Sequence, residues 1–106
     1  RRIGLVVVGA GPEGKSLKSK VKSLKLETNI IFESWINQEM LYSYYKTADL
    51  FLVASLYEGY GMTLVEAQAA GCKIVSTDVG VAREAKAVIA KLNSADLSNK
   101  IIEALA

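Results

Sequence analysis

Short apolar segments alternate with longer amphipathic segments along most of this chain of 106 residues. We predict that the apolar segments form strands, over Ile3–Val8, Asn29–Phe32, Leu50–Ala54, Lys73–Ser76 and Ala87–Ala90. The amphipathic segments predict helices over Glu13–Leu26, after a cap at Asn37, from Thr63 to a stop at Gly71, over Val81–Ala85 and after a cap at Ser94. Apolar strands that alternate with helices indicate a parallel sheet covered on both faces.

The composition is that of one globular domain covering residues 1–106. Hydrophobic residues make up 51% of the chain and charged residues 23%, which separates it from disordered sequences. The formal net charge of +2 is too small to indicate binding to nucleic acid or to an anionic membrane. Every apolar run is too short to span a membrane.

Histidine is absent, and Cys72 is the single cysteine. A catalytic triad that depends on histidine is therefore excluded, and we expect no metal site. Because one cysteine cannot form an internal disulfide, we expect a reducing, cytoplasmic location.

The stretch Ser55–Gly71, which reads SLYEGYGMTLVEAQAAG, is the strongest candidate for a functional site. Glycines at 59 and 61 let backbone N–H groups approach a ligand closely. The first N–H groups of a helix lack partners within the helix and lie at the positive end of its dipole. We therefore predict an anion site, suited to phosphate, over Gly61, Met62 and Thr63.

Two carboxylates, Glu58 and Glu66, frame this segment with seven residues between them. A carboxylate accepts hydrogen bonds through two oxygens, so Glu66 is suited to a vicinal diol such as a ribose and Glu58 to another hydroxyl. An alternative is purely structural, because Thr63-Leu64-Val65-Glu66 has the pattern of a capping box. In that case Thr63 bonds forward and Glu66 bonds back to the start of the helix.

The segment EGYGMTLVEA resembles the E-x7-E element of the retaining glycosyltransferases called group 1, which have the GT-B fold. The similarity extends through VVVGAGPEG, NIIFESW and YYKTADLFLVASLYEGYGMTLVEAQAAGCKIVSTDVGVARE to the last helix, and so covers nearly the whole chain. The resemblance implies the donor-binding part of an enzyme that moves a sugar from a nucleoside-diphosphate sugar to an acceptor.

The resemblance also implies a role for individual residues. Glu58 would be the catalytic carboxylate that contacts the transferred sugar, and Glu66 would hold the ribose. The other implied donor-binding residues are Gly59, Tyr60, Gly61, Met62, Thr63, Trp35 and Ile36. The helix start would stabilise the charge that develops on the departing phosphate, a role that needs neither a metal nor a cofactor.

Aromatic residues outside this stretch have structural interpretations as well. Trp35 follows a predicted strand, and packing at the edge of the core is the alternative to contact with the nucleobase. Tyr42, Tyr44 and Tyr45 fall at helical spacing, which is typical of packing rather than of chemistry.

The family's donor domain opens with a strand and a loop that carry an Arg and a Lys, and no segment of this chain matches them. The N-terminal acceptor-binding domain is also unmatched. We therefore expect a partial donor domain that is inactive in transfer by itself and has the acceptor domain as its missing partner.

Removing that central strand from the family's order 3-2-1-4-5-6 leaves the order 2-1-3-4-5. We accordingly predict a doubly wound, Rossmann-like parallel sheet of five strands in this flavodoxin-like order, within a monomer. A dimer that exchanges a strand to fill the gap is the alternative.

A competing interpretation centres on GAGPEG at residues 9–14, a literal G-x-G-x-x-G between a strand and a helix. With Glu33 at the end of the next strand, Gly9, Gly11 and Gly14 would form an NAD- or FAD-binding unit. The following helix is rich in lysine, whereas the fingerprint places small apolar residues there. A folded segment that binds no ligand is a third interpretation.

Overall fold

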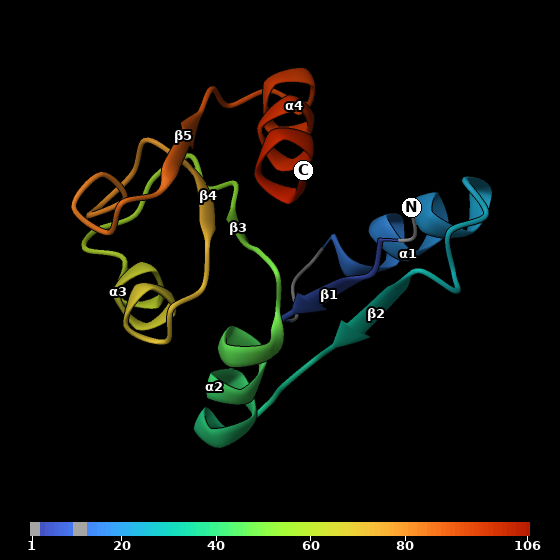
Figure 1. Cartoon of the computed structure of the whole chain (residues 1–106). Helices are drawn as coiled ribbons and strands as arrows, with labels where there is room; N and C mark the ends of the chain where they lie inside the picture. Colours follow the sequence, from blue (N-terminus) through green and yellow to red (C-terminus); the bar gives the residue numbers. More distant parts are fainter. Residues whose placement is uncertain (1–2, 10–12) are drawn as a thin grey trace. The chain divides into compact units, whose positions relative to one another are not determined.

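The computed structural model of this protein describes residues 3–9 and 13–106. The chain divides into two compact units, Arg1–Gln38 and Glu39–Ala106. Strands and helices alternate as far as the fourth strand, the fifth strand follows it without a helix between them, and a helix ends the chain (Figure 1). All strand pairs among the described residues are parallel. The predicted α/β class is therefore confirmed.

The first unit contains β1 (Leu5–Val8), α1 (Gly14–Ser23) and β2 (Ile30–Glu33), coloured from dark blue to teal in Figure 1. The two strands pair in parallel from Leu5 opposite Ile30 to Val8 opposite Glu33. Asn29 fastens the start of this pair, because its carbonyl accepts from Leu5 N at 2.9 Å and its side-chain amide donates to Ile3 O at 3.2 Å. All three elements lie within the segments predicted for them, give or take one residue.

The expected burial of the first strand on both faces is not observed. Leu5 is 44% exposed and Val8 is 46% exposed, and α1 contributes no buried residue. A pair of strands with one short helix has too little structure to enclose a strand.

The segment proposed for a dinucleotide is described only in part. Gly9 has φ 125°, which favours glycine, and its N–H donates to Glu33 O at 2.8 Å. Glu13 is the N-cap of α1 and Gly14 is its first residue, whereas Gly11 lies outside the described residues. The NAD or FAD interpretation therefore stays untested.

The second unit holds a parallel sheet in the order β3-β4-β5. Its elements are the helix α2 that begins at the unit boundary (Gln38–Thr47), β3 (Phe51–Val53), α3 (Met62–Ala69), β4 (Ile74–Thr77), β5 (Val88–Ala90) and α4 (Ser94–Leu105). All four residues of the central strand β4 are buried. This accounts for its continuous apolar start, because a central parallel strand is covered on both faces.

The hydrophobic core of the second unit forms where helices pack on this sheet. In this unit α3 contacts β4, and α4 contacts β4 and β5. Its buried cluster consists of Tyr45, Val53, Leu64, Ala67, Cys72, Ile74, Val79, Ala82 and Ala85. Cys72 therefore lies in the core as a free thiol, and burial raises its pKa.

One predicted helix cap and one predicted short helix in this unit are wrong. Asn93, not Ser94, caps α4, because its backbone is extended and its Oδ1 accepts from Asp96 N at 2.7 Å. Residues 81–85 form turns instead of a short helix. Among the backbone bonds described for this segment, the bond from Ala85 N to Val81 O has the four-residue spacing of an α-helix, and Lys86 then turns to φ 61°, which ends helical geometry.

The two sheets, β1-β2 and β3-β4-β5, each agree with their part of the order 2-1-3-4-5. Their union in one sheet of five strands stays a prediction. Among the described residues, no helix has both the length and the apolar character needed to cross a membrane.

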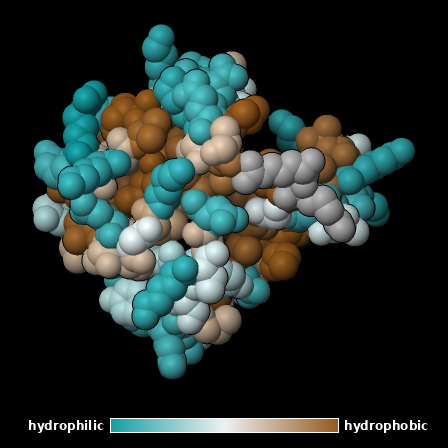
Figure 2. Space-filling model, in the orientation of Figure 1, coloured by the Kyte–Doolittle hydropathy of each residue, from teal (hydrophilic) through white to brown (hydrophobic). Residues whose placement is uncertain are grey.

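Apolar residues are not confined to the core. Figure 2 shows hydrophobic residues in brown beside hydrophilic residues in teal on the face that it draws. In the second unit the most exposed large ones are Leu56 and Tyr57, at 83% and 81%. Both belong to the loop after β3, which is the loop singled out from the sequence.

Candidate functional site

The candidate site lies where β3 and β4 end. The loop over residues 54–61 follows β3, and residues 78–81 follow β4. Because β3 and β4 are parallel neighbours, their carboxyl ends meet at one edge of the sheet. This is the edge at which open α/β sheets bind ligands.

The loop after β3 is fastened to the end of β4 at two points. Near its start, the Thr77 hydroxyl donates to Ser55 O at 2.7 Å. Near its end, the Val81 N–H donates to Tyr60 O at 2.9 Å. The residues between these two points, Glu58 among them, are therefore held at both ends.

Gly80 makes the second of these attachments possible. Its φ is +48°, and a Cβ built on it would clash with the backbone carbonyl oxygen of Tyr60. A side chain at this position would therefore push the loop away from the end of β4. Only glycine combines the left-handed backbone with this close approach.

Glu58 is half-buried in the loop, and its carboxylate has a specific partner. The Ser55 hydroxyl donates to Glu58 Oε1 at 3.0 Å. One carboxylate oxygen is thus engaged within the loop, and this bond fixes the orientation of the carboxylate. A carboxylate oriented in this way is suited to accept from a ligand hydroxyl through its remaining lone pairs.

The start of α3 differs from the predicted capping box. Gly61, with φ 91° and ψ 57°, is the N-cap, and no side-chain hydrogen bond caps the helix. Thr63 is the second helical residue, so it cannot cap the helix, and the capping-box interpretation is wrong. Glycine enters the left-handed region without cost, so the chain turns into the helix two residues earlier than predicted. The first N–H groups of α3 thus lack a side-chain cap, which is what an anion site needs.

Glu66 has a partner on another helix. The hydroxyl of Tyr42, on α2, donates to Glu66 Oε2 at 3.3 Å. The Tyr42 ring lies 6.5 Å from the ring of Tyr45, which is only 3% exposed. The Glu66 carboxylate is therefore connected through Tyr42 to the core of the unit.

The side chain of Tyr45 is buried in the core, and its hydroxyl is buried as well. Burial, helped by the negative charge of Glu66, raises the pKa of Tyr45 to about 12. Among the described residues, no hydrogen-bond partner is found for this hydroxyl. Tyr45 therefore packs as predicted, while it carries a polar group that the core does not satisfy.

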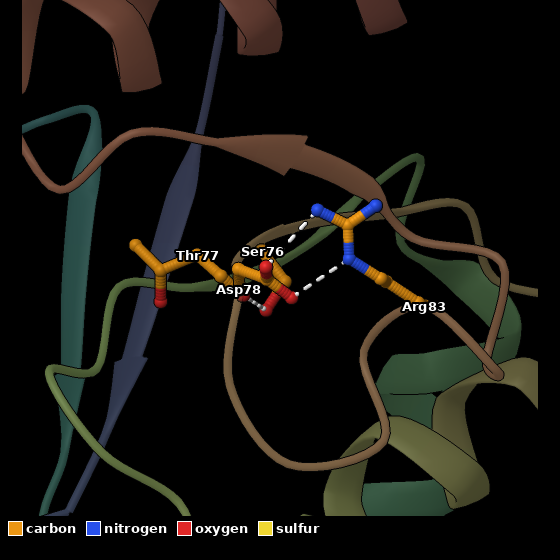
Figure 3. Close-up of polar contacts among 4 residues, drawn as sticks. All are labelled: Ser76, Thr77, Asp78 and Arg83. Carbon is orange, nitrogen blue, oxygen red and sulfur yellow. Dashed lines mark hydrogen bonds and ion pairs between the residues drawn. The ribbon is translucent and has the colours of Figure 1, made fainter.

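An exposed ion pair lies on the segment after β4 (Figure 3). The Arg83 guanidinium faces the Asp78 carboxylate, with Nε to Oδ1 and Nη2 to Oδ2 both at 3.0 Å. This two-point contact raises the pKa of Arg83 and is the geometry that arginine favours with carboxylates. The pair braces the turn that carries Gly80.

The other predicted site residues divide between the two units. Gly59, Tyr60, Met62 and Thr63 are exposed around the helix start, and Gly61 is half-buried there. Trp35 and Ile36 belong to the first unit. Trp35 is 78% exposed, so its alternative role in core packing is wrong, and its role toward a nucleobase stays a prediction.

Three residues at the site were not predicted as functional, namely Ser55, Thr77 and Tyr42. Ser55 stands three residues before Glu58, a spacing at which a hydroxyl can reach a carboxylate across a turn. Thr77 is a polar residue at the end of an apolar strand, which is itself a signal. No pattern in the sequence separates Tyr42 from Tyr44 and Tyr45.

Among the described residues, no cluster of three or more acidic or cysteine side chains could hold a metal ion.

Comparison with known proteins identifies a family whose sequence pattern this chain matches. The family model described as "Glycosyl transferases group 1" matches residues 1–106. Mannosylfructose-phosphate synthase of Agrobacterium fabrum is 46% identical over 61 residues, which are 58% of this chain and 13% of that protein. Alpha-monoglucosyldiacylglycerol synthase of Streptococcus pneumoniae is 35% identical over 75 residues, which are 71% of this chain and 17% of that protein.

A solved structure with a similar fold is sucrose-phosphate synthase from Thermosynechococcus elongatus. It superimposes with a TM-score of 0.81 and 25% identity over 94% of this chain and 28% of its own. The chain thus spans well under a third of each of these three proteins.

Proposed function

This chain belongs to the group 1 glycosyl transferases, and we propose that it forms the part that binds the sugar donor, a nucleoside-diphosphate sugar. The family predicted from the E-x7-E element is thereby confirmed. Glycosyl transfer is the chemistry of the family. The donor, the retaining stereochemistry and the GT-B arrangement are the further content of the proposal.

The observation that carries the proposal is the construction of the loop after β3. It holds Glu58 by a bond from Ser55, and it delivers the chain into α3 at Gly61 without a side-chain cap. A carboxylate and a set of helix N–H groups are thus offered on one short segment. A sugar with its hydroxyls joined to a diphosphate presents the matching groups.

Each part of the donor has a proposed contact. The Glu58 carboxylate accepts from a hydroxyl of the transferred sugar, and the start of α3 binds the diphosphate. Glu66, oriented by Tyr42, accepts from the ribose hydroxyls. Trp35 and Ile36 contact the base. As the sugar leaves, negative charge grows on the diphosphate, and the fixed N–H groups of the helix stabilise it without a metal or cofactor.

Transfer itself is proposed for a protein that contains this chain together with an acceptor-binding domain. The relatives in which the chain is matched are several times longer than the matched segment. We also propose that the chain works in a reducing, cytoplasmic compartment, where a buried free thiol such as Cys72 is stable.

A thermal shift experiment with UDP, GDP, ADP, NAD and FAD tests the proposal. A ligand that binds the folded chain at concentration L raises its stability by about RT ln(1 + L/Kd). We expect stabilisation by at least one nucleoside diphosphate and a further shift when its sugar is attached. Stabilisation by NAD or FAD alone would instead support the dinucleotide interpretation at Gly9, Gly14 and Glu33. No shift with any of the five would support a folded segment without a ligand.

We further propose that the two sheets join as one sheet in the order 2-1-3-4-5. The observed pairs β1-β2 and β3-β4-β5 support it, since each is a contiguous part of that order.

A further inference from the structure

Thr77, at the end of β4, reaches the proposed sugar-binding carboxylate through one intermediate residue. Its hydroxyl donates to the backbone carbonyl of Ser55 at 2.7 Å. The side-chain hydroxyl of Ser55 then donates to Glu58 Oε1 at 3.0 Å. We propose that Thr77 is a positioning residue, which sets the orientation of the Glu58 carboxylate toward the sugar of the donor by holding Ser55. This inference rests on the proposed function of Glu58.

Thr77 is suited to this role because it belongs to the fully buried strand of the second unit. It ends the central strand, whose four residues are all buried, and Thr77 itself is 3% exposed. The neighbouring Ser76 hydroxyl donates to Thr77 O at 2.7 Å and fixes the backbone there (Figure 3). A β-branched side chain has few rotamers, so the Thr77 hydroxyl stays aimed at Ser55.

The loop has little other support near Glu58. The side chains of Leu56 and Tyr57 are more than four-fifths exposed, so they do not anchor the segment by packing. The second attachment, from Val81 N to Tyr60 O, lies beyond Glu58. The Thr77 bond on one side and the Tyr60 bond on the other hold the segment that carries Glu58, whose Cβ lies beside Gly80.

The two attachments of the loop act on different parts of the proposed donor site. The Tyr60 attachment and Gly61 govern the start of α3, where the diphosphate is proposed to bind. The Thr77 bond acts on Ser55 and Glu58, which face the sugar in the proposal. Loss of the Thr77 hydroxyl should therefore weaken binding of the nucleotide-sugar while leaving the bare nucleoside diphosphate nearly unaffected.

The test compares the ratio of Kd for UDP to Kd for UDP-glucose, and the corresponding GDP and GDP-mannose ratio, by calorimetry. Thr77→Val replaces the hydroxyl by a methyl group at almost constant volume, and Thr77→Ser restores the hydroxyl. Thr47→Val makes the same exchange on α2, where the hydroxyl only bonds to Ser43 O within the helix, at 2.8 Å. Ser55→Ala removes the second link without touching β4, so it serves if Thr77→Val does not fold.

We expect Thr77→Val and Ser55→Ala to lower this ratio of dissociation constants by about fivefold to tenfold. The reason is that a Glu58 carboxylate without a fixed orientation makes a weaker hydrogen bond to the sugar. Thr77→Ser and Thr47→Val should keep the parent ratio, and Kd for the bare nucleotide should stay within about twofold. A parent chain that binds both ligands equally would overturn the sugar role of Glu58, and with it this inference. A parent chain that prefers the nucleotide-sugar, with Thr77→Val and Ser55→Ala keeping that preference, would overturn the positioning role alone.

Discussion

The Tyr42 hydroxyl donates a hydrogen bond to Glu66 Oε2 at 3.3 Å, and this bond joins α2 to α3. Glu66 is thereby held by a tyrosine whose ring lies against the buried ring of Tyr45. In the predicted capping box, the Glu66 carboxylate would accept from the backbone N–H of Thr63. In this chain it is instead directed by a neighbouring helix, which suits a carboxylate that binds a ligand.

Replacing Glu66 by alanine separates stability from binding. Because Gly61 caps α3 and no side chain contributes a capping bond, we expect Glu66→Ala to change the free energy of unfolding by less than about 1 kcal/mol. Affinity for a nucleoside diphosphate should fall by about 1–3 kcal/mol, as for hydrogen bonds to a charged group that are lost. Denaturant melts and calorimetric titrations measure the two quantities. Unchanged nucleotide affinity would show that Glu66 does not hold the ribose.

Removing the Tyr42 hydroxyl tests whether that bond orients Glu66. Tyr42→Phe keeps the ring and deletes the donor, so we expect nucleoside-diphosphate affinity to fall by about 0.5–1.5 kcal/mol. Tyr44→Phe makes the same change on the same helix and serves as the control. Equal affinities of the two variants would contradict an orienting role for Tyr42. The effect of Tyr42→Phe should vanish in a Glu66→Ala background, since the two changes remove one interaction.

Gly80→Ala should destabilise the loop attachment. The new Cβ would meet Tyr60 O, and the residue would keep a left-handed backbone. Gly71→Ala is the matched control, because Gly71 has φ +81° but open space around it. We expect the control to lose about 1 kcal/mol of unfolding free energy and Gly80→Ala to lose about 2–4 kcal/mol. Urea denaturation of both variants gives the comparison, and equal losses would show that the contact with Tyr60 does not matter.

Tyr45→Phe should stabilise the chain near neutral pH. The variant keeps the edge-to-face contact with Phe51, whose ring centroid lies 5.2 Å away. It removes a buried hydroxyl for which no partner is found among the described residues. We expect the free energy of unfolding to rise by about 1 kcal/mol, since an unpaired buried hydroxyl is costly. A loss of stability in urea melts would mean that this hydroxyl makes a favourable interaction.

The same variant gives a test in alkaline solution. The pKa of Tyr45 is about 12 in the folded chain and 10.0 as an ordinary tyrosine. Above the lower value the unfolded chain releases this proton while the folded chain retains it, so stability falls as pH rises from about 10 to 12. Over that range the parent should lose roughly 1 kcal/mol per pH unit more than Tyr45→Phe. Parallel melts of the two chains at about pH 9 and 11 measure this difference, because the two chains differ in no other titratable group.

The proposed single sheet predicts a monomer in which β1 pairs with β3. Cross-strand nuclear Overhauser contacts between residues of β1 and β3 would demonstrate the pairing, with the observed Leu52–Val75 pair of β3 and β4 as the internal standard. Sedimentation velocity should give a single species of monomer mass. A dimer that shows the same cross-strand contacts would establish the exchanged-strand alternative instead.

The strands were predictable from the sequence because their apolar runs are bounded by polar or glycine residues. The start of α3 was not. Thr63 with Glu66 matches a capping box, yet the left-handed backbone of Gly61 begins the helix at Met62. A sequence pattern cannot reveal a backbone angle, and glycine is compatible with several. Asn93 and Ser94 present the same difficulty, since both residue types are good caps and they are adjacent.

The two glutamates and the helix start were predictable as a candidate site, whereas the residues that hold them were not. Ser55 and Thr77 are 22 positions apart and meet only because β3 and β4 are neighbours in the sheet. Tyr42 and Glu66 are 24 positions apart on two helices. Such pairs depend on tertiary packing, which local spacing does not encode.

The attachment of Tyr60 through its backbone carbonyl has a consequence for how this loop can diversify. The contact with Val81 uses no side-chain atom of Tyr60, which is 59% exposed. The side chains of Leu56 and Tyr57 are also largely exposed, so core packing does not require these particular residues. The loop can therefore exchange its side chains at these three positions while its path is kept by Thr77 and Gly80. A library randomised at 56, 57 and 60, with 77 and 80 held constant, should yield many folded variants that differ in the sugar they accept.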